Sequence, residues 1–128
     1  MVQRFFLKKD AYLSEKKIIR KLFLEGTFIK QTPFKIIFLQ LREQQSSKVQ
    51  ILVSVPKRLF RHAVERNLLK RRIREAYRLN KHILLNSMND FNSCIIIAFI
   101  YSVKVIHEYQ YIQSMMRKSL LKIEEALL

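Results

Sequence analysis

Four basic side chains recur at every fourth position in the middle of the chain, at Arg66, Lys70, Arg74 and Arg78. On a helix this spacing places them on one face, where each neighbouring pair of like charges is unfavourable by roughly 0.2–0.5 kcal/mol in water. Guanidinium groups donate hydrogen bonds in a planar fork that matches a phosphate group. The ladder therefore predicts a surface that binds a polyanion. The plainer alternative is the solvated basic face of an amphipathic helix.

The stretch around this ladder is basic throughout. Between positions 56 and 81 the chain carries ten of its 25 Lys and Arg residues, and Glu65 and Glu75 are the only acids there. The net charge of +15 and the isoelectric point of about 10.3 favour RNA, DNA or an acidic membrane surface as the partner. The candidate nucleic-acid contacts in this stretch are Lys57, Arg58, Arg61, Arg66, Asn67, Lys70, Arg71, Arg74 and Arg78.

The sequence contains few residues in arrangements suited to catalysis. An enzyme that acts alone needs an acid–base pair, an activated nucleophile or a set of metal ligands. The three histidines, His62, His82 and His107, are scattered, and the two aspartates have no carboxylate at metal-ligand spacing. One glycine leaves no phosphate-cradling loop, and one cysteine leaves no zinc site. We therefore expect no catalytic residue and no metal site in the protein, so a partner should supply the reactive groups of any reaction.

The elements that must position these cations follow from hydrophobic periodicity and turn residues. After a basic and aromatic arm over residues 1–13, we expect a helix between Ser14 and Gly26, strands at Phe34–Leu41 and Val49–Val55, a helix from about His62 to Lys81, a strand at Cys94–Val103 and a helix at Glu108–Leu127. This order, αββαβα, predicts an α+β fold with helices packed on a small sheet. The length suits one core, so residues 1–128 are expected to form a single domain.

Finer predictions concern how these elements pack. The two early strands flank a polar turn and are expected to form an antiparallel hairpin. The strand that begins at Cys94 is almost wholly apolar, as expected for burial on both faces. Gly26 suits the C′ position that ends a helix. The segment after Lys81 is expected to fray into a loop. The expected buried stripe of the basic helix comprises Leu68, Leu69, Ile73, Ala76 and Leu79, with Tyr77 at its boundary.

The cysteine content and the apolar segments indicate in which cellular compartment the protein works. The single cysteine, Cys94, excludes an internal disulfide and fits a reducing cytoplasm. The longest apolar run, over residues 94–103, is too short to span a bilayer as a helix. The N-terminal residues lack the apolar segment of a secretory signal. These features predict a cytoplasmic protein with no membrane partner.

The run SVPKRLFRHAVERNLLKRRIREAYR, over residues 54–78, closely resembles the signature of the bacterial ribonuclease P protein component. In that family a Ser-Val step out of a strand and a basic pair precede the pattern A-x-x-R-N-x-x-K-R-x-x-R-E on a helix. The matching positions in this chain are Arg66, Asn67, Lys70, Arg71, Arg74 and Glu75. Residues 57–81 would then be the RNA-docking motif and helix.

The resemblance implies a fold and a function. The family fold is αβββαβα with a left-handed crossover around the motif helix, so a short further strand is expected near residues 26–30. The protein would be the small subunit of an endonuclease that removes the 5′ leader of precursor tRNA. Its partners would be precursor tRNA and a catalytic RNA subunit, which performs the hydrolysis. Mg²⁺ would be held by that RNA and not by the protein.

The resemblance also implies a cleft for the leader between the first helix and the sheet. The candidate cleft residues are Lys16, Ile19, Arg20, Phe23, Ile37 and Phe38. The chain departs from the family pattern at three positions. Leu68 stands where the motif has a second Arg, and Ile19 and Ile37 stand where the cleft has aromatic residues, with Phe38 adjacent to Ile37.

Three other readings of the basic helix remain open at this point. A general RNA-binding or ribosomal protein would share the charge, but it need not carry Asn67 and Glu75 in register with the cations. A helix-turn-helix DNA-binding protein would need a short helix before the basic one, where this sequence predicts a strand. A membrane-surface helix would need its apolar side, which the core requires here.

Overall fold

The computed structural model describes residues 16–41, 48–86 and 94–127. Its elements, in chain order, are α1 (Lys16–Glu25), β1 (Thr27–Gln31), β2 (Phe34–Leu41), β3 (Val49–Ser54), α2 (Ala63–Asn80), α3 (His82–Leu85), β4 (Cys94–Tyr101) and α4 (Tyr109–Leu127). The order αβββαβα is confirmed, with the short β1 where the resemblance placed a further strand. The chain stays helical after Lys81 through α3, which buries Leu84, and most of the segment expected to fray into a loop lies outside the described residues. The predicted arm over residues 1–13 and Ser14, the predicted start of the first helix, lie outside the described residues.

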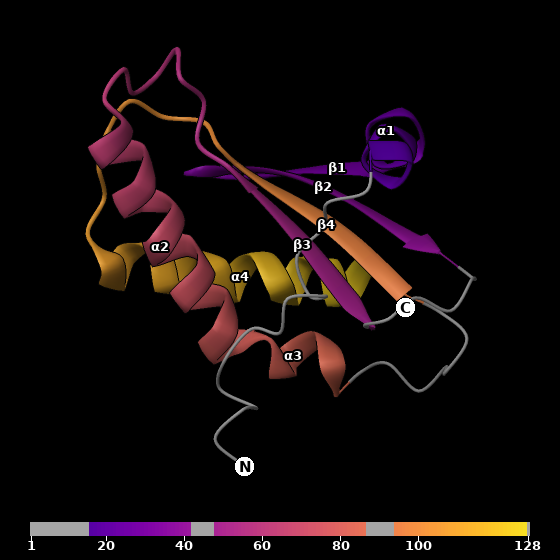
Figure 1. Ribbon diagram of the computed structural model, residues 1–128. Helices are drawn as coiled ribbons and strands as arrows, with labels where there is room; N and C mark the ends of the chain where they lie inside the picture. The colour runs from indigo at the N-terminus through magenta and orange to yellow at the C-terminus, as the bar shows by residue number, and fades with distance from the viewer. Residues whose placement is uncertain (1–15, 42–47, 87–93, 128) are drawn as a thin grey trace.

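The apolar strand β4 occupies the interior of the sheet, whose order is β1-β2-β4-β3 (Figure 1). β1 pairs antiparallel with β2, β2 pairs antiparallel with β4, and β3 pairs parallel with β4. The predicted hairpin between β2 and β3 is therefore wrong, because β4 lies between them. A strand whose residues are apolar at almost every position buries most surface when it has a neighbour at each edge and a layer over each face. The tight hairpin of this fold joins β1 to β2.

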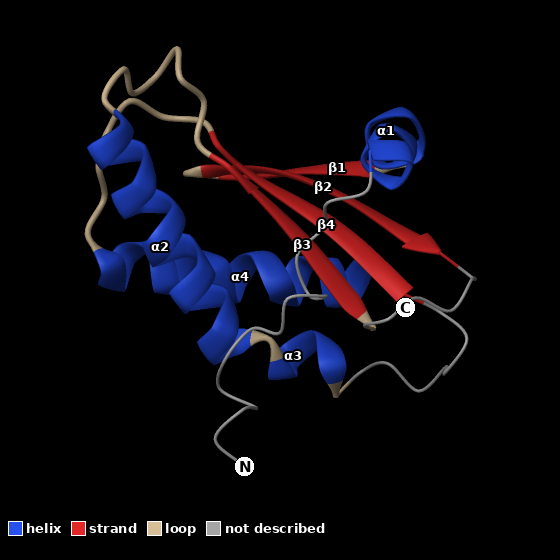
Figure 2. Ribbon diagram, viewed as in Figure 1, coloured by secondary structure: helices blue, strands red, loops and turns tan. Residues whose placement is uncertain are grey.

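Alternation along β2 divides the apolar side chains between two layers. Phe34, Ile36 and Phe38 point into the larger core, which the sheet shares with α2 and α4. Ile37 and Leu41 point to the opposite face and pack with Leu22 of α1. Figure 2 shows this arrangement, with α1 on one side of the sheet and the other three helices on the opposite side. The two faces of the sheet are thus available for different tasks.

The helix that carries the basic motif packs on α4 and on the sheet. Leu69, Ile73 and Ala76 are fully buried as predicted, and Tyr77 is buried with them. The Tyr77 ring lies 6.2 Å from the ring of Phe99, and burial raises the pKa of the Tyr77 hydroxyl well above its usual range. Leu79 is 40% exposed, so its predicted burial is wrong. The buried stripe of α2 therefore includes Tyr77 in place of Leu79, and the tyrosine ring covers more of the core than a leucine side chain would.

The connection from β3 to β4 runs through α2 and α3, which lie on the α4 side of the sheet (Figure 1). Parallel neighbouring strands require such a crossover connection, and here the crossover itself is the basic motif helix. The left-handed sense expected for it stays a prediction. In this topology the basic motif helix follows the edge strand β3 and leads, through α3, to the interior strand β4.

Gly26 ends α1 for a reason that the sequence did not indicate. As predicted, Gly26 lies just past the last residue of α1, and its φ is not positive. A Cβ at this position would collide with the carbonyl oxygen of Leu22 and would lie 2.6 Å from Cγ2 of Ile37. Glycine is needed here because the end of α1 touches the sheet directly, and this close approach fixes where α1 lies on the sheet.

Candidate nucleic-acid interface

The four residues of the basic ladder do not have equal roles in the structure. Arg66 Nη1 donates hydrogen bonds to the carbonyl oxygens of Phe60 at 2.8 Å and Arg61 at 2.9 Å. Arg78 forms an ion pair with the Glu75 carboxylate one turn earlier. Arg66 and Arg78 therefore have partners within the protein, and these contacts offset part of the like-charge repulsion predicted for the ladder.

The outward surface of α2 carries the rest of the predicted set. Asn67 and Arg71 are exposed, while Lys70 and Arg74 are half-buried at the flank of the helix. Glu65 and Glu75 are the acidic residues of α2. The Arg72 side chain turns the other way, toward α4, and its Nη1 donates to the carbonyl oxygen of His107 at 2.6 Å. Arg72 therefore holds the loop before α4.

The segment before α2 presents a second group of cations. Lys57, Arg58 and Arg61 are exposed. Leu59 and Phe60 point inward, and the Phe60 ring lies 5.9 Å from the ring of Tyr101. The amides of Leu59 and Phe60 both donate to the carbonyl oxygen of Pro56, which closes a tight turn. This short loop therefore displays its charged side chains because its apolar ones are fixed in the core.

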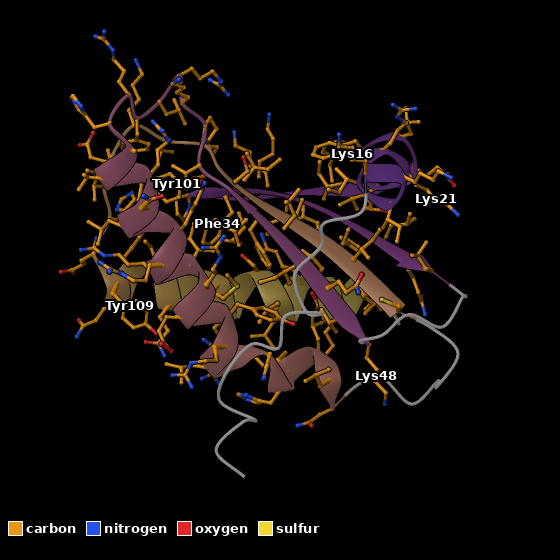
Figure 3. The ribbon with its side chains drawn as sticks, in the orientation of Figure 1. Lys16, Lys21, Phe34, Lys48, Tyr101 and Tyr109 are labelled. Carbon is orange, nitrogen blue, oxygen red and sulfur yellow. The ribbon has the colours of Figure 1, made fainter. Side chains whose placement is uncertain are left out.

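Tyr101 organises the end of the sheet at which this loop lies. Its hydroxyl donates to the carbonyl oxygen of Val105 at 2.7 Å and accepts a hydrogen bond from the amide of His107 at 3.2 Å. Burial raises the pKa of the Tyr101 hydroxyl, so it stays protonated near neutral pH. The ring points into the core beside Phe34, as the side chains in Figure 3 show. One buried tyrosine thus joins the loop before α2 to the loop before α4.

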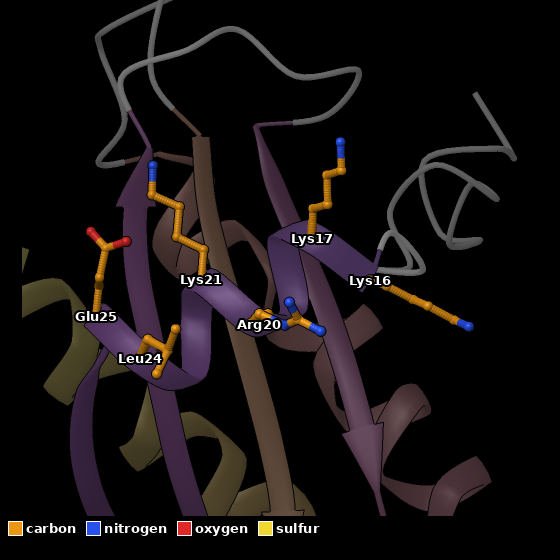
Figure 4. Close-up of a pocket in the computed structure, with 6 residues that line it drawn as sticks. All are labelled: Lys16, Lys17, Arg20, Lys21, Leu24 and Glu25. Atoms are coloured by element: carbon orange, nitrogen blue, oxygen red, sulfur yellow. The ribbon is translucent and has the colours of Figure 1, made fainter.

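A basic surface also covers α1 on the opposite side of the sheet. A hollow of about 560 Å³ runs along the solvent side of this helix, and its lining residues are Lys16, Lys17, Arg20, Lys21, Leu24 and Glu25 (Figure 4). Four of these six side chains are cations, and Glu25 lies at the end of the helix. Lys16 and Arg20, two of the predicted cleft residues, belong to this hollow. The hollow offers an anion several cationic partners.

The other predicted cleft residues are placed differently. Phe23 is 43% exposed at the surface of α1, whereas Ile19 packs partly buried against the inner side of that helix. Ile37 is only 1% exposed beneath α1. The candidate Phe38 is wrong, because side chains alternate along a strand and this ring lies in the larger core on the other face. Of the predicted hydrophobic cleft residues, Phe23 is the one with a substantially exposed side chain.

One exposed aromatic residue was missed by the sequence analysis. Phe28 of β1 is 59% exposed and lies directly opposite Ile37 in the β1–β2 register, so it is on the α1 face of the sheet. Lys30 and Lys35 also face each other in this register, on the same face as Phe28, and both are exposed. Phe28 can be placed on this face only once residues 27–31 are known to form a strand paired with β2.

The described residues offer little to a metal ion or to a nucleophilic mechanism. Across residues 16–41, 48–86 and 94–127, no three side chains of His, Cys, Asp or Glu lie close enough together to hold a metal. Burial raises the pKa of the Cys94 thiol to about 11, so at neutral pH it stays protonated and a poor nucleophile. The same ranges contain no helix that is both long and apolar enough to cross a membrane.

These features define a class of protein: a small α+β domain whose sheet separates two basic surfaces, one on α2 and its preceding loop and one on α1. Residues 7–124 match the family model for Ribonuclease P. The chain is 34% identical over 119 residues to the ribonuclease P protein component of Porphyromonas gingivalis, which covers 93% of this chain and 87% of that protein. It is 37% identical over 81 residues to the same component of Chlorobium phaeobacteroides, covering 61% of this chain and 56% of that protein.

Solved structures have the same fold. The RNase P protein from Thermotoga maritima superposes with a TM-score of 0.67 at 19% identity, covering 87% of this chain and 96% of that one. The RNase P protein from Staphylococcus aureus gives a TM-score of 0.62 at 22% identity, covering 93% and 92% of the two chains. The chain belongs to the bacterial ribonuclease P protein family, the protein components of a tRNA-processing ribonucleoprotein endonuclease.

Proposed function

We propose that the protein docks on the RNA subunit of ribonuclease P through α2 and the loop before it. The observation that supports this most directly is the group of exposed cations on these two neighbouring segments, within the family's own motif. The proposed contacts are Lys57, Arg58, Arg61, Asn67, Lys70, Arg71 and Arg74. Arg78 contributes less because its guanidinium is paired with Glu75. Each cation that neutralises a phosphate releases counterions, so binding weakens steeply as salt rises.

The opposite face of the sheet holds the 5′ leader of precursor tRNA in this proposal. Phe28 and Phe23 supply exposed rings on which unpaired bases stack. Lys30 and Lys35 lie opposite each other across β1 and β2, where like charges destabilise a sheet, and a bound phosphate relieves this repulsion. Lys16 and Arg20 extend the positive surface onto α1. The aromatic contact that the family pattern places at the position of Ile37 is thus supplied in this proposal by its cross-strand neighbour Phe28.

Chemistry and binding are divided between the two subunits. In this proposal the RNA subunit performs the hydrolysis and holds the Mg²⁺ ions. Across residues 16–41, 48–86 and 94–127 the protein has no group of His, Cys, Asp or Glu side chains that could hold a metal ion. The protein contributes positive charge, which lowers the repulsion between two polyanionic RNAs, and it positions the leader. The particle would work in the cytoplasm, where precursor tRNA is made in bacteria.

The experiment that tests this function is reconstitution. The protein is mixed at low Mg²⁺ concentration with the ribonuclease P RNA of the same genome, and cleavage of a precursor tRNA is followed on a gel. We expect leader removal that is at least tenfold faster than with the RNA alone, because protein cations replace part of the electrostatic role of the metal. A carrier protein with no affinity for RNA serves as the control. An equal rate of leader removal with and without the protein would contradict the proposed function.

Replacing Phe28 by alanine is expected to reduce affinity for a leader-bearing precursor by about tenfold, because stacking contributes about 1–3 kcal/mol per base. Binding of mature tRNA, which has no leader, should be unchanged. The measurement is a titration of the holoenzyme with each RNA. The matched control is Leu121→Ala, which removes an exposed apolar side chain from α4, on the other side of the sheet, and should leave binding of both RNAs unchanged. If Phe28→Ala weakens both RNAs equally, Phe28 does not contact the leader.

A further inference from the structure

The basic motif begins with an arginine in an unfavourable electrostatic position. Arg66 lies in the first turn of α2, where the helix dipole is positive and disfavours a cation. His62, which precedes the helix, makes no side-chain cap, so the helix start lacks this common means of stabilisation. An arginine placed here for phosphate binding alone would carry this penalty without compensation inside the protein.

The structure contains that compensation. One terminal nitrogen of Arg66, Nη1, donates to two successive carbonyl oxygens, those of Phe60 and Arg61. A hydrogen bond from a charged donor is worth about twice a neutral one. The two carbonyl groups belong to the loop that displays Lys57, Arg58 and Arg61. Arg66 is therefore bonded to the backbone from which the exposed cations project.

Apart from Arg66, the loop is held by the packing of Leu59 and Phe60 in the core and by its own turn. Phe60 packs on Tyr101, and two amide bonds to Pro56 close the turn. Figure 1 shows this loop and the loop before α4 at the same end of the sheet, away from other elements. Because Lys and Arg side chains are long and rotamer-rich, a loop that orders their backbone reduces the entropy lost when they bind phosphates.

We propose that Arg66 is a positioning residue, which fixes the loop over residues 56–62 so that Lys57, Arg58 and Arg61 meet successive phosphates of the RNA subunit. The inference rests on the proposed docking function and assigns Arg66 a role different from that of Arg71 in the same motif. Arg71 is exposed on α2 and acts directly on phosphate. Arg66 acts through the loop, and most of its effect on binding disappears when the loop cations are absent.

A double-mutant cycle separates the two roles. Arg66→Gln is made in the wild-type protein and in a variant that carries Lys57→Gln, Arg58→Gln and Arg61→Gln, and affinity for the RNA subunit is measured at several salt concentrations. We expect Arg66→Gln to weaken binding about tenfold in the wild type and less than twofold in the loop variant. In the wild-type background, Arg66→Gln should reduce the slope of log affinity against log salt concentration by more than the roughly 0.7–0.9 that the loss of one phosphate contact would cause.

Arg71→Gln is the matched control, since it removes one arginine from the same helix. It should weaken binding by the same factor in both backgrounds. Equal effects of Arg66→Gln in the two backgrounds would overturn the inference and make Arg66 a direct phosphate contact. Should Arg66→Gln fail to fold, as judged by circular dichroism, the cycle is run with Arg66→Lys, which keeps the charge but loses the planar fork.

A second readout needs no RNA. Hydrogen exchange of the free protein is measured at the amides of Leu59 and Phe60, which are protected by their bonds to Pro56. We expect at least tenfold faster exchange in Arg66→Gln and no change in Arg71→Gln, whereas unchanged exchange in both would overturn the inference. If the wild-type protein did not bind the RNA subunit, the proposed function would fail. The exchange experiment would still decide what Arg66 does to the loop.

Discussion

Replacing Lys70 and Arg71 together by glutamine is expected to weaken binding to the RNA subunit by about 100-fold at low salt. Both side chains lie on α2 away from its buried stripe, and Arg71 is exposed. Each phosphate contact is worth about a factor of ten, and its loss lowers the slope of log affinity against log salt by about one. The measurement is a filter-binding or fluorescence titration at several salt concentrations, in which the slope should fall by about two.

The control variant for this prediction loses the same amount of charge from a different part of the protein. Lys118→Gln with Lys122→Gln removes two exposed cations from α4, so both double variants lower the net charge from +15 by the same amount. We expect the α4 variant to bind within about threefold of the wild type, because long-range charge is screened within about 10 Å at 0.1 M salt. An equal loss in the two variants would mean that total charge, and not α2, determines docking.

Replacing Phe99 by alanine is expected to lower the free energy of unfolding by about 3–5 kcal/mol, a large share of the stability of a small domain. Phe99 is fully buried in the central strand. Its ring meets Phe34 edge-on at 5.9 Å and Tyr77 at 6.2 Å, so it joins β2, β4 and the docking helix. Alanine would leave a cavity at the point where α2 rests on the sheet. Urea unfolding, followed by circular dichroism, measures the change.

Phe28→Ala provides the comparison within the same sheet. It removes the same side chain from a position that is 59% exposed, and we expect a change of no more than about 0.5–1 kcal/mol. The two variants thus separate burial from residue type. If Phe99→Ala unfolded at the same urea concentration as Phe28→Ala, the ring of Phe99 would not be the contact between sheet and docking helix that the structure describes.

The sequence alone was sufficient for the features that depend on neighbours along the chain. The period of α2, the unbroken apolar run of β4 and the stripe of α4 are local patterns, and each element formed where the pattern predicted it. The basic motif is also local, since its residues lie within one helix and one loop. The family therefore followed from 25 consecutive residues, over positions 54–78.

The tertiary structure decided which residues of that motif are exposed and what the rest of the sheet offers. Strand order depends on pairing between distant segments, and the insertion of β4 between β2 and β3 leaves no trace in either strand's own pattern. A shift of one position along a strand moves a side chain to the opposite face, so Phe38 lies in the core while Phe28, on a strand that was only suspected, faces solvent. Arg66 and Arg71 are both arginines of one helix, yet only the folded loop beside Arg66 supplies the carbonyl groups that it bonds.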